Sequence, residues 1–312
     1  MAHKVILDCD PGHDDVLALL LAHAHPAIEL LAVTTVAGNQ TLDKTTLNAR
    51  RVMSAAGIND VPIAAGAALP LMRDQVTAPE VHGESGLEGW SFDEPKVAVD
   101  SRHAVDLIAE TLVAHNEVTL VPVGPLTNIA LALHRYPGAM AKVKEIVLMG
   151  GSSGLGNTTP AAEFNIHADP EVAHVVFSSG LPITMVPLDL THQAIVSPGI
   201  LERMRSIGNP VADMAAALLG FYTQAIDQAE GLWGAALHDP CAVARVIDPE
   251  VVDCIRTNVV VETARSWSYG ATVCDLQGVT GRPPNVSIAQ DLDEDAFWDL
   301  VLGALTTYPE GG

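Results

Sequence analysis

Four carboxylates stand within eight residues near the start of the chain, at Asp8, Asp10, Asp14 and Asp15. The apolar run 5–7 comes directly before them and predicts a short buried strand, while the apolar stretch 16–22 predicts a packed helix. The acidic cluster therefore falls in a strand-to-helix turn. In open α/β sheets, ligands bind outside the carboxyl ends of the strands, where such turns lie.

The charges of this cluster need an explanation. Two unit charges about 4 Å apart repel by about 4 kcal/mol at an effective dielectric constant near 20. Asp8 and Asp10 point to the same side of a strand, and Asp14 and Asp15 lie about 100° apart around a helix axis. Carboxylate oxygens suit Ca²⁺ or Mg²⁺. A helix dipole would explain Asp14 and Asp15, but it leaves the two strand carboxylates without a reason.

The overall charge narrows the range of partners. Lys plus Arg number 16 and Asp plus Glu number 38, which gives a net charge of −22. Such an acidic chain is a poor partner for nucleic acid, whose phosphates need Lys and Arg. No apolar run approaches the roughly 20 residues of a membrane span, and the start resembles no signal peptide. Cysteines 9, 241, 254 and 274 form no CxxC pair, so we expect a cytoplasmic protein with reduced thiols.

Strand-like and helix-like segments alternate along the chain, which predicts an α/β fold. We expect a single domain over residues 1–312 with an open, mostly parallel, Rossmann-like sheet and helices on both faces. The expected strands are 5–7, 30–37, 62–65, 118–123, 145–149, 183–186, 251–261 and 271–276. The expected helices begin at 16 and cover 41–56, 101–115, 198–207, 210–229 and 293–307. Two long loops, 67–95 and 150–170, are typical of functional segments.

Five motifs follow one another in order over residues 5–285. They are Asp-x-Asp-Pro-Gly-x-Asp-Asp at 8–15, Gly-Pro-Leu-Thr-Asn at 124–128, Met-Gly-Gly at 149–151, Glu-Phe-Asn at 163–165 and His-Asp-Pro at 238–240. In these motifs the chain resembles the inosine-uridine-preferring nucleoside hydrolases. The resemblance implies the nucleoside hydrolase fold and a Ca²⁺-dependent enzyme that splits a ribonucleoside into ribose and a free base. It also implies a homo-oligomer, either a dimer or a tetramer, and we expect a homotetramer.

The resemblance assigns roles to residues at the matching positions. The carboxylates of Asp10, Asp15 and Asp239 and the backbone oxygen of Thr127 would bind Ca²⁺. A second set of residues would bind the substrate: Asp14, Asn39, Met149, Glu163, Phe164, Asn165 and His238. In this set Met149 would pack near the sugar, and Phe164 belongs to the Glu-Phe-Asn motif. Asp8 would orient Asp10 or Asn39 without touching the metal.

The resemblance also implies the chemistry. Ca²⁺ can lower the pKa of a bound water, and Asp10 is placed to take its proton. The leaving base needs a proton donor. His238, beside Asp239, is the first candidate, and His82 in the loop 67–95 is the second. Trp233 and Trp267 could stack on a base. Members of the family often carry an aromatic or polar side chain near the bound base, in the helix before His-Asp-Pro. Here the stretch 226–231, which follows Tyr222, contains no aromatic residue, so the preference between purine and pyrimidine bases stays open.

Simpler structural interpretations exist for several of these residues. Asn39 after Gly38 could be a turn residue, and Thr127 could be a helix N-cap. Glu163 and Asp169 could be acids at a loop and at a helix start. Two other functions are also considered. One is a non-catalytic, Ca²⁺-assisted nucleoside- or ribose-binding protein. The other is an aspartate-dependent phosphatase, which would need Lys or Arg near the acidic edge to bind phosphate.

Overall fold

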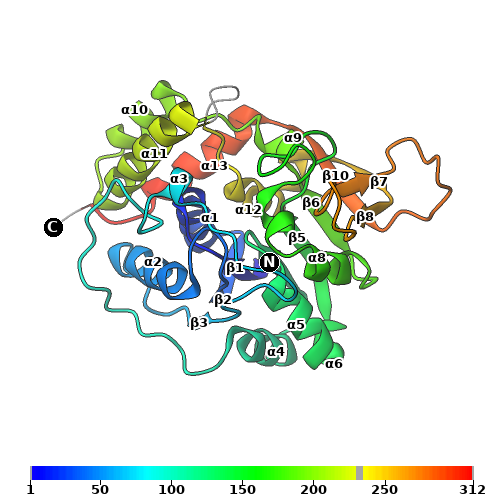
Figure 1. Cartoon of the computed structure of the whole chain (residues 1–312). Coiled ribbons are helices and arrows are strands. Elements are labelled where there is room, and N and C mark those ends of the chain that lie inside the picture. The colour runs from blue at the N-terminus through cyan, green and yellow to red at the C-terminus, as the bar shows by residue number, and fades with distance from the viewer. Residues whose placement is uncertain (1, 230–234, 311–312) are drawn as a thin grey trace.

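The computed structural model describes residues 2–229 and 235–310, and an eight-stranded sheet runs through its centre (Figure 1). The order of its strands is β3-β2-β1-β4-β5-β6-β10-β7, and β8 and β9 form a separate two-stranded sheet. The strands are β1 (His3–Cys9), β2 (Ile28–Thr35), β3 (Ile63–Ala65), β4 (Val118–Pro122), β5 (Val143–Met149), β6 (Ile183–Val186), β7 (Val252–Thr257), β8 (Val259–Val261), β9 (Thr272–Cys274) and β10 (Val286–Leu292).

The main sheet is parallel except at one edge, where β7 runs antiparallel to β10. Its first six strands follow the order 3-2-1-4-5-6 of doubly wound dinucleotide-binding folds. In that order the chain reverses its direction of progress between β1 and β4. The crevice at such a switch point is where ligands bind. The predicted site residue Asp10 comes directly after β1, and Thr127 follows β4 after a short turn.

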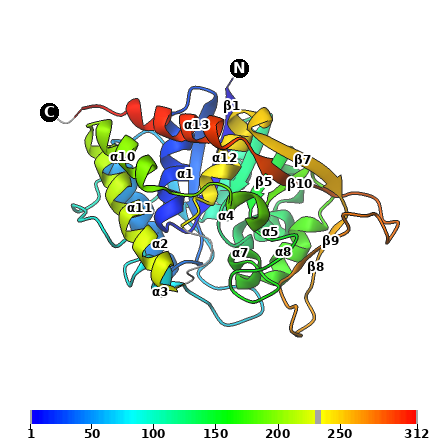
Figure 2. The same ribbon diagram turned by 90° about the horizontal axis from the view of Figure 1, so that it is seen from above.

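Helices cover both faces of the sheet. They are α1 (His13–Ala24), α2 (Leu42–Ala55), α3 (Pro79–His82), α4 (Ala104–Ala114), α5 (Thr127–Arg135), α6 (Pro137–Met140), α7 (Phe164–Ala168), α8 (Pro170–Phe177), α9 (Leu188–Thr191), α10 (Pro198–Ser206), α11 (Pro210–Ala229), α12 (Asp239–Ile247) and α13 (Glu294–Thr306), with a 3₁₀ turn at Pro249–Val251. In Figures 1 and 2, α10 and α11 lie across the molecule from α5 and α8.

The alternation of side chains along β1 explains the two layers. Val5, Leu7 and Cys9 enter the core on the side of α1 and α11–α13, whereas Ile6 enters the core on the side of α4, α5 and α8. Because both faces of the strand are buried, its sequence is a continuous apolar run. Within the buried part of the strand, residues 5–9, the break in this pattern is Asp8, which is 1% exposed and so must find partners inside the protein.

Most of the elements predicted from the sequence are confirmed, several with the same ends. Strand β6 and helix α11 cover the predicted residues 183–186 and 210–229. The predicted strand 251–261 is wrong as one element, because β7 pairs with β10 while β8 pairs with β9. Each long loop also contains a short helix that was not predicted, α3 in the first and α7 at the end of the second.

The most consequential error is strand β10, which the sequence analysis did not predict. It lies inside the main sheet between β6 and β7. Its second half, Gln290 to Leu292, carries polar residues because the strand emerges toward the surface there, and a register shift follows Ala289. Since β1 and β10 belong to one sheet, the two ends of the chain meet in one structure.

None of the helices that the structure describes is long and apolar enough to cross a membrane. This agrees with the absence of long apolar runs in the sequence.

The buried contacts of α13 give a stability prediction. Phe297 is fully buried, at 0% exposure, and its ring meets Trp298 edge-on with centroids 5.1 Å apart. Phe297→Ala should lower the free energy of unfolding by about 3–5 kcal/mol, measured by denaturant titration. Trp267→Ala is the control, because Trp267 is 98% exposed and should change stability by less than about 0.5 kcal/mol. Equal losses for both variants would contradict this packing.

Candidate active site

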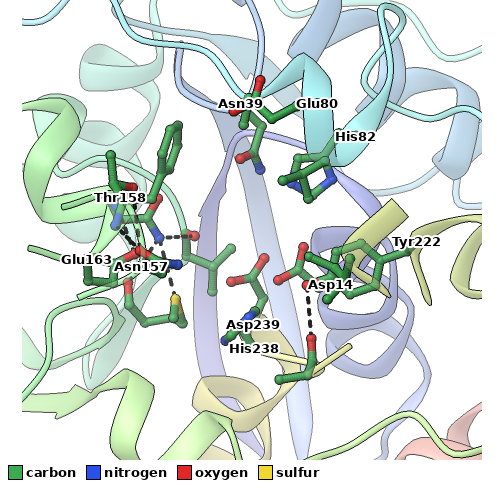
Figure 3. Close-up of a pocket in the computed structure, with 18 of the residues that line it drawn as sticks. Asp14, Asn39, Glu80, His82, Asn157, Thr158, Glu163, Tyr222, His238 and Asp239 are labelled. Carbon is green, nitrogen blue, oxygen red and sulfur yellow. Dashed lines mark hydrogen bonds between the residues drawn. The ribbon is translucent and has the colours of Figure 1, made fainter. Parts of the chain in front are cut away.

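A cavity of about 230 Å³ opens at the switch point between β1 and β4. Every residue predicted to bind substrate lines it, namely Asp14, Asn39, Met149, Glu163, Phe164, Asn165 and His238, together with His82 and Asp239. Figure 3 shows Asp239 and Asp14 at its base, Glu163 on one wall, and His82 with Tyr222 on the other. Residues that lie far apart in the sequence therefore meet in one pocket.

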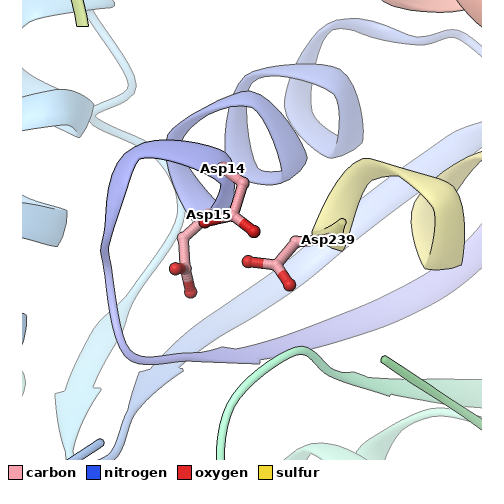
Figure 4. Close-up of side chains that lie close together, drawn as sticks. All are labelled: Asp14, Asp15 and Asp239. Atoms are coloured by element: carbon pink, nitrogen blue, oxygen red, sulfur yellow. The ribbon is translucent and has the colours of Figure 1, made fainter. Parts of the chain in front are cut away.

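Three carboxylates converge beside this cavity. Oxygens of Asp14, Asp15 and Asp239 all lie within 4.8 Å of one another, and all three residues are buried. Figure 4 shows them facing one another, two from the first turn of α1 and one from the first turn of α12. A carboxylate at a helix start is stabilised by the helix dipole, and here two such starts point at one place.

Asp10 is linked to this group, and hydrogen bonds and close-packed backbone fix its position. Its backbone N–H donates to Asp15 Oδ1 at 3.0 Å, and its own Oδ2 accepts from the backbone N–H of Asn39 at 2.7 Å. A Cβ atom on Gly38 or Gly124 would overlap its carboxylate, so both glycines are required there. Its Oδ1 is buried and has no hydrogen-bond partner among the described residues, which leaves that oxygen for a ligand.

Burial raises the pKa of every acid in the group. The pKa of Asp14 rises to about 7 and that of Asp15 to about 6, chiefly through desolvation. The pKa values of Asp10 and Asp239 rise well above their usual range, through burial first and then the charges of neighbouring aspartates. Such a group must hold protons or a cation near neutral pH. The hard oxygen donors and the partnerless Asp10 Oδ1 fit Ca²⁺.

Thr127 and Asp8 hold different partners from those considered in the sequence analysis. Thr127 is the first residue of α5 and follows the N-cap position, Leu126, so its interpretation as an N-cap is wrong. Asp8 Oδ1 accepts hydrogen bonds from Thr34 Oγ1 at 2.6 Å and Asn128 Nδ2 at 2.8 Å. The expectation that it orients Asp10 or Asn39 is therefore corrected, because these bonds fix β2 and the start of α5.

The Glu-Phe-Asn stretch supplies polar atoms to the cavity wall. Glu163 is the N-cap of α7, and its carboxylate accepts from the backbone N–H groups of Gly151, Asn165 and Ile166 at 2.7–3.0 Å. A carboxylate has about four lone-pair sites, so it can still accept a bond from a ligand. Asn165 donates its amide to Val123 O at 2.8 Å and Met149 O at 3.3 Å, which leaves its carbonyl oxygen to accept.

Asn39 is more than a turn residue. Besides its backbone bond to Asp10, its Nδ2 donates to Asp15 Oδ2 at 3.3 Å. It therefore links two of the carboxylates predicted to bind metal while its side chain also faces the cavity.

The two candidate proton donors line different parts of the cavity. In Figure 3, His238 lies beside Asp239 at the base, and His82 lies on the wall away from Glu163. His238 Nδ1 pairs with Thr191 Oγ1 at 2.7 Å, and burial, then the neighbouring His192, lowers the pKa of His238 to about 3. His82 Nδ1 lies 3.0 Å from His13 Nδ1, and burial holds the pKa of His82 well below its usual range. Both rings are neutral imidazoles at pH 7 in the protein without a ligand.

The cavity also contains residues that the sequence analysis did not assign to it. They are Val76, Thr77, Ala78, Glu80, Val81, Val123, Asn157, Thr158, His192, Tyr222, Ile226 and Ala236. The i, i+4 spacing of Tyr222 and Ile226 on α11 was a usable signal for a shared face. No sequence signal marked His192. Trp267 does not line the cavity and is exposed, and Trp233 lies outside the described residues.

Comparison with known proteins gives one consistent result. Residues 5–299 match the family model described as inosine-uridine preferring nucleoside hydrolase. The pyrimidine-specific ribonucleoside hydrolase RihA of Salmonella schwarzengrund is 46% identical over 99% of this chain and 100% of its own length. The pyrimidine-specific ribonucleoside hydrolase RihB of Shigella sonnei is 46% identical over 98% of this chain and 97% of its own.

A solved structure agrees with these relatives. A purine-preferring ribonucleoside hydrolase from Gardnerella vaginalis superposes with a TM-score of 0.90 at 29% identity, covering 97% of this chain and 98% of that one.

The raised pKa values predict how stability depends on pH without a divalent cation. Asp14 has an ordinary pKa of 3.8 and a folded pKa of about 7, so the folded state binds its proton more tightly. The resulting stability is complete below pH 4 and is lost as the pH rises through 7. In the presence of a chelator, this term should therefore lower the melting temperature between pH 4 and pH 7.

Thermal unfolding measured across that range checks this expectation. Asp14→Asn removes one of these ionisable groups and should make the profile less steep, and saturating Ca²⁺ should restore the wild-type protein at pH 7. A chelated wild-type protein that becomes more stable from pH 4 to pH 7, with Asp14→Asn unchanged in slope, would contradict the buried charge.

Proposed function

The chain belongs to the inosine-uridine preferring nucleoside hydrolase family, and from this premise we propose how its cavity hydrolyses ribonucleosides to ribose and free base. The observation that carries the proposal is that one cavity joins a buried acidic group to the polar atoms of Asn39, Glu163 and Asn165. No lysine or arginine is among the described residues that line it, so a phosphate substrate has no counter-charge.

We propose that Ca²⁺ is held by the carboxylates of Asp10, Asp15 and Asp239 and by the backbone oxygen of Thr127. The convergence of Asp15 and Asp239 with Asp14 supports this, and Asp14 would then lie beside the cation as well as beside the sugar. When bound, the ion supplies a positive charge that orients sugar hydroxyls and lowers the pKa of a coordinated water. The carboxylates would then stay ionised at neutral pH.

Asp10 is the proposed general base. Its partnerless Oδ1 can accept a proton from the attacking water, while Asn39 N–H and the glycine backbones keep the carboxylate fixed. A base positioned in this way generally contributes 10²–10⁴-fold to the rate. The proton moves from the water oxygen to Asp10 as the water oxygen bonds to the anomeric carbon and the bond to the base breaks.

The ribose is held by groups that can each bond a hydroxyl. Asp14 and Glu163 offer acceptors, and Asn165 offers its carbonyl oxygen because its amide N–H groups are already used. Met149 and Phe164 also line the cavity and can pack on the sugar. As the ring develops oxocarbenium character, bonds to its hydroxyls that strengthen in the transition state lower the barrier.

The departing base needs a proton, and we propose His238 as its first donor and His82 as the alternative. His238 is fixed by Thr191 through Nδ1, so its Nε2 is the nitrogen left to face a ligand. His82 is fixed through Nδ1 in the same way. Because each ring is neutral at pH 7 without a ligand, the donor would first have to take up a proton once the nucleoside is bound. That proton would then pass from Nε2 to the base nitrogen or oxygen that gains charge as the glycosidic bond breaks, leaving a neutral imidazole.

We propose pyrimidine ribonucleosides as the preferred substrates. The curated relatives named as pyrimidine-specific are 46–48% identical to this chain, whereas the purine-preferring structural relative is 29% identical. We further propose that the chain forms one domain, acts in the cytoplasm and assembles as a dimer or tetramer, with a homotetramer as the first choice. The sheet that joins both ends of the chain supports the single domain.

Sugar recognition gives the direct test of this function. Uridine, cytidine, inosine and 2′-deoxyuridine are incubated with the protein, and released base is followed by chromatography. Uridine and cytidine should be hydrolysed fastest, and deoxyuridine up to 10⁴–10⁵-fold more slowly, because buried groups that bond a hydroxyl reject its absence. Asn165→Ala should impair all ribonucleosides alike. Deoxyuridine turned over as fast as uridine would overturn the ribose assignment, and binding without release of base would indicate a binding protein.

The proton donor is tested by changing the leaving group. His238→Ala should slow uridine hydrolysis by about 10²–10⁴-fold, since general acid help is worth that much. It should barely affect p-nitrophenyl riboside, whose phenolate leaves without a proton. His82→Ala is the matched comparison, and the same selective loss there would assign the role to His82. An equal loss on both substrates for His238→Ala would mean that it supports the metal or the ribose instead.

A further inference from the structure

Asp169 is a buried carboxylate at the start of a helix that it does not cap. It occupies the N-cap position of α8, directly before Pro170, yet its side chain makes no capping hydrogen bond. It is 0% exposed, and burial raises its pKa above the usual range. Burial of a carboxylate costs free energy unless hydrogen bonds compensate for the lost water, so the groups that Asp169 does bind indicate its structural role.

One oxygen of Asp169 joins two separate parts of the active site. Its Oδ2 accepts from Thr127 Oγ1 at 2.8 Å and from the backbone N–H of Leu71 at 2.9 Å. Thr127 is the residue whose backbone oxygen is the proposed Ca²⁺ ligand. Leu71 begins the stretch that reaches the cavity at Val76, Thr77 and Ala78.

The residue after Thr127 is fixed in a parallel way. Asn128 donates its amide to Asp8 Oδ1 at 2.8 Å and to Thr35 O at 3.0 Å, and its own Oδ1 accepts from Ala67 N at 2.8 Å. The carbonyl group of Thr127 lies in the peptide that joins these two residues. Because the side chain on each side of that peptide is held, the direction of its oxygen is held as well.

The stretch from Leu71 is also tied at the surface. Arg265 donates to Met72 O at 2.8 Å, and Arg73 donates to the backbone oxygen of His167. These arginine contacts are at least partly exposed to solvent and so contribute little each. The bond to Asp169 is the one made by a fully buried carboxylate, so it is expected to hold this stretch most firmly.

We propose that Asp169 is a positioning residue that holds Thr127 in place for Ca²⁺ and at the same time fixes the stretch 71–78 that lines the substrate cavity. This inference rests on the proposed metal site, and it adds a shared anchor for the metal ligand and the cavity wall. Loss of Asp169 should weaken metal binding and loosen that wall together.

Calcium affinity of the chelated protein, measured by titration calorimetry without substrate, tests the first half. Thr127→Val removes the hydroxyl but keeps the backbone oxygen, and Asp169→Ala removes the acceptor. Both should weaken Ca²⁺ binding by about 10–100-fold, as loss of groups that orient metal ligands does. The double variant should be no weaker than Asp169→Ala, because both changes remove one interaction.

Thr184→Val is the matched control. Thr184 is a buried threonine on β6, and its hydroxyl donates to the carboxylate of Glu145 on β5, at 2.6 Å from Oε1. It should bind Ca²⁺ like the wild-type protein. Weakening equal to that of Thr127→Val would show that general loosening explains the effect, and the proposal would fall.

Hydrogen exchange at the Leu71 amide tests the second half. Asp169→Ala should make this amide exchange at least about 10-fold faster, whereas Thr127→Val should leave it protected, since Asp169 still accepts from it. Asp169→Asn keeps one acceptor oxygen and should retain part of both properties. If Asp169→Ala does not fold, Thr127→Val and Asp169→Asn still decide the result.

The outcomes separate this inference from the function on which it rests. Ca²⁺ affinity unchanged in Thr127→Val overturns the positioning of the metal ligand, and an unchanged Leu71 amide in folded Asp169→Ala overturns the shared anchor. A wild-type protein that hydrolyses uridine but binds no Ca²⁺ overturns the metal assignment and the inference with it.

Discussion

Mutual repulsion among the buried carboxylates Asp10, Asp14, Asp15 and Asp239 is the constraint on which the rest of this active site depends. Burial removes the water that would screen them, so each can be ionised at neutral pH only with a compensating charge. The surrounding structure is built to keep them together all the same. Two helix starts and the backbone N–H groups of Asp10, Gly12 and Asn39 place partial positive charge next to these carboxylates. The glycines at 38 and 124 leave room for the Asp10 carboxylate.

The parallel sheet makes this concentration of acids possible. Strands β1 and β4 pair side by side at the switch point, so the Asp10 carboxylate after β1 lies against Gly124 after β4 although the two are far apart in the sequence. Several residues then serve the fold and the site together. Glu163 caps α7 while it lines the cavity, and Asn39 links two carboxylates while it also lines the cavity. Substitution of such residues therefore changes stability as well as activity, and kinetic effects need a folding control.

The sequence predicted the acidic turn, the alternating α/β organisation and part of the cavity lining, because these depend on local patterns and ordered motifs. It did not predict β10, whose polar second half hides its place inside the sheet, or His192, which no local pattern distinguishes. It also assigned Asp8 to the wrong neighbours, and it placed Asp169 correctly at a helix start without indicating which groups it binds. Hydrogen bonds such as Asp8 to Asn128 and Asp169 to Leu71 join residues about 100 positions apart, and only the folded chain shows them.

The central claim is that a divalent cation takes the place of protons in this acidic group, and proton release on binding Ca²⁺ measures it directly. Calorimetric titration of the chelated protein at pH 6, repeated in buffers of different ionisation enthalpy, counts the protons released. Because the pKa values of Asp14 and Asp15 are about 7 and 6 without metal, binding should release protons at pH 6 and fewer at pH 8. Binding with no proton release at pH 6, or no binding at all, would contradict the account.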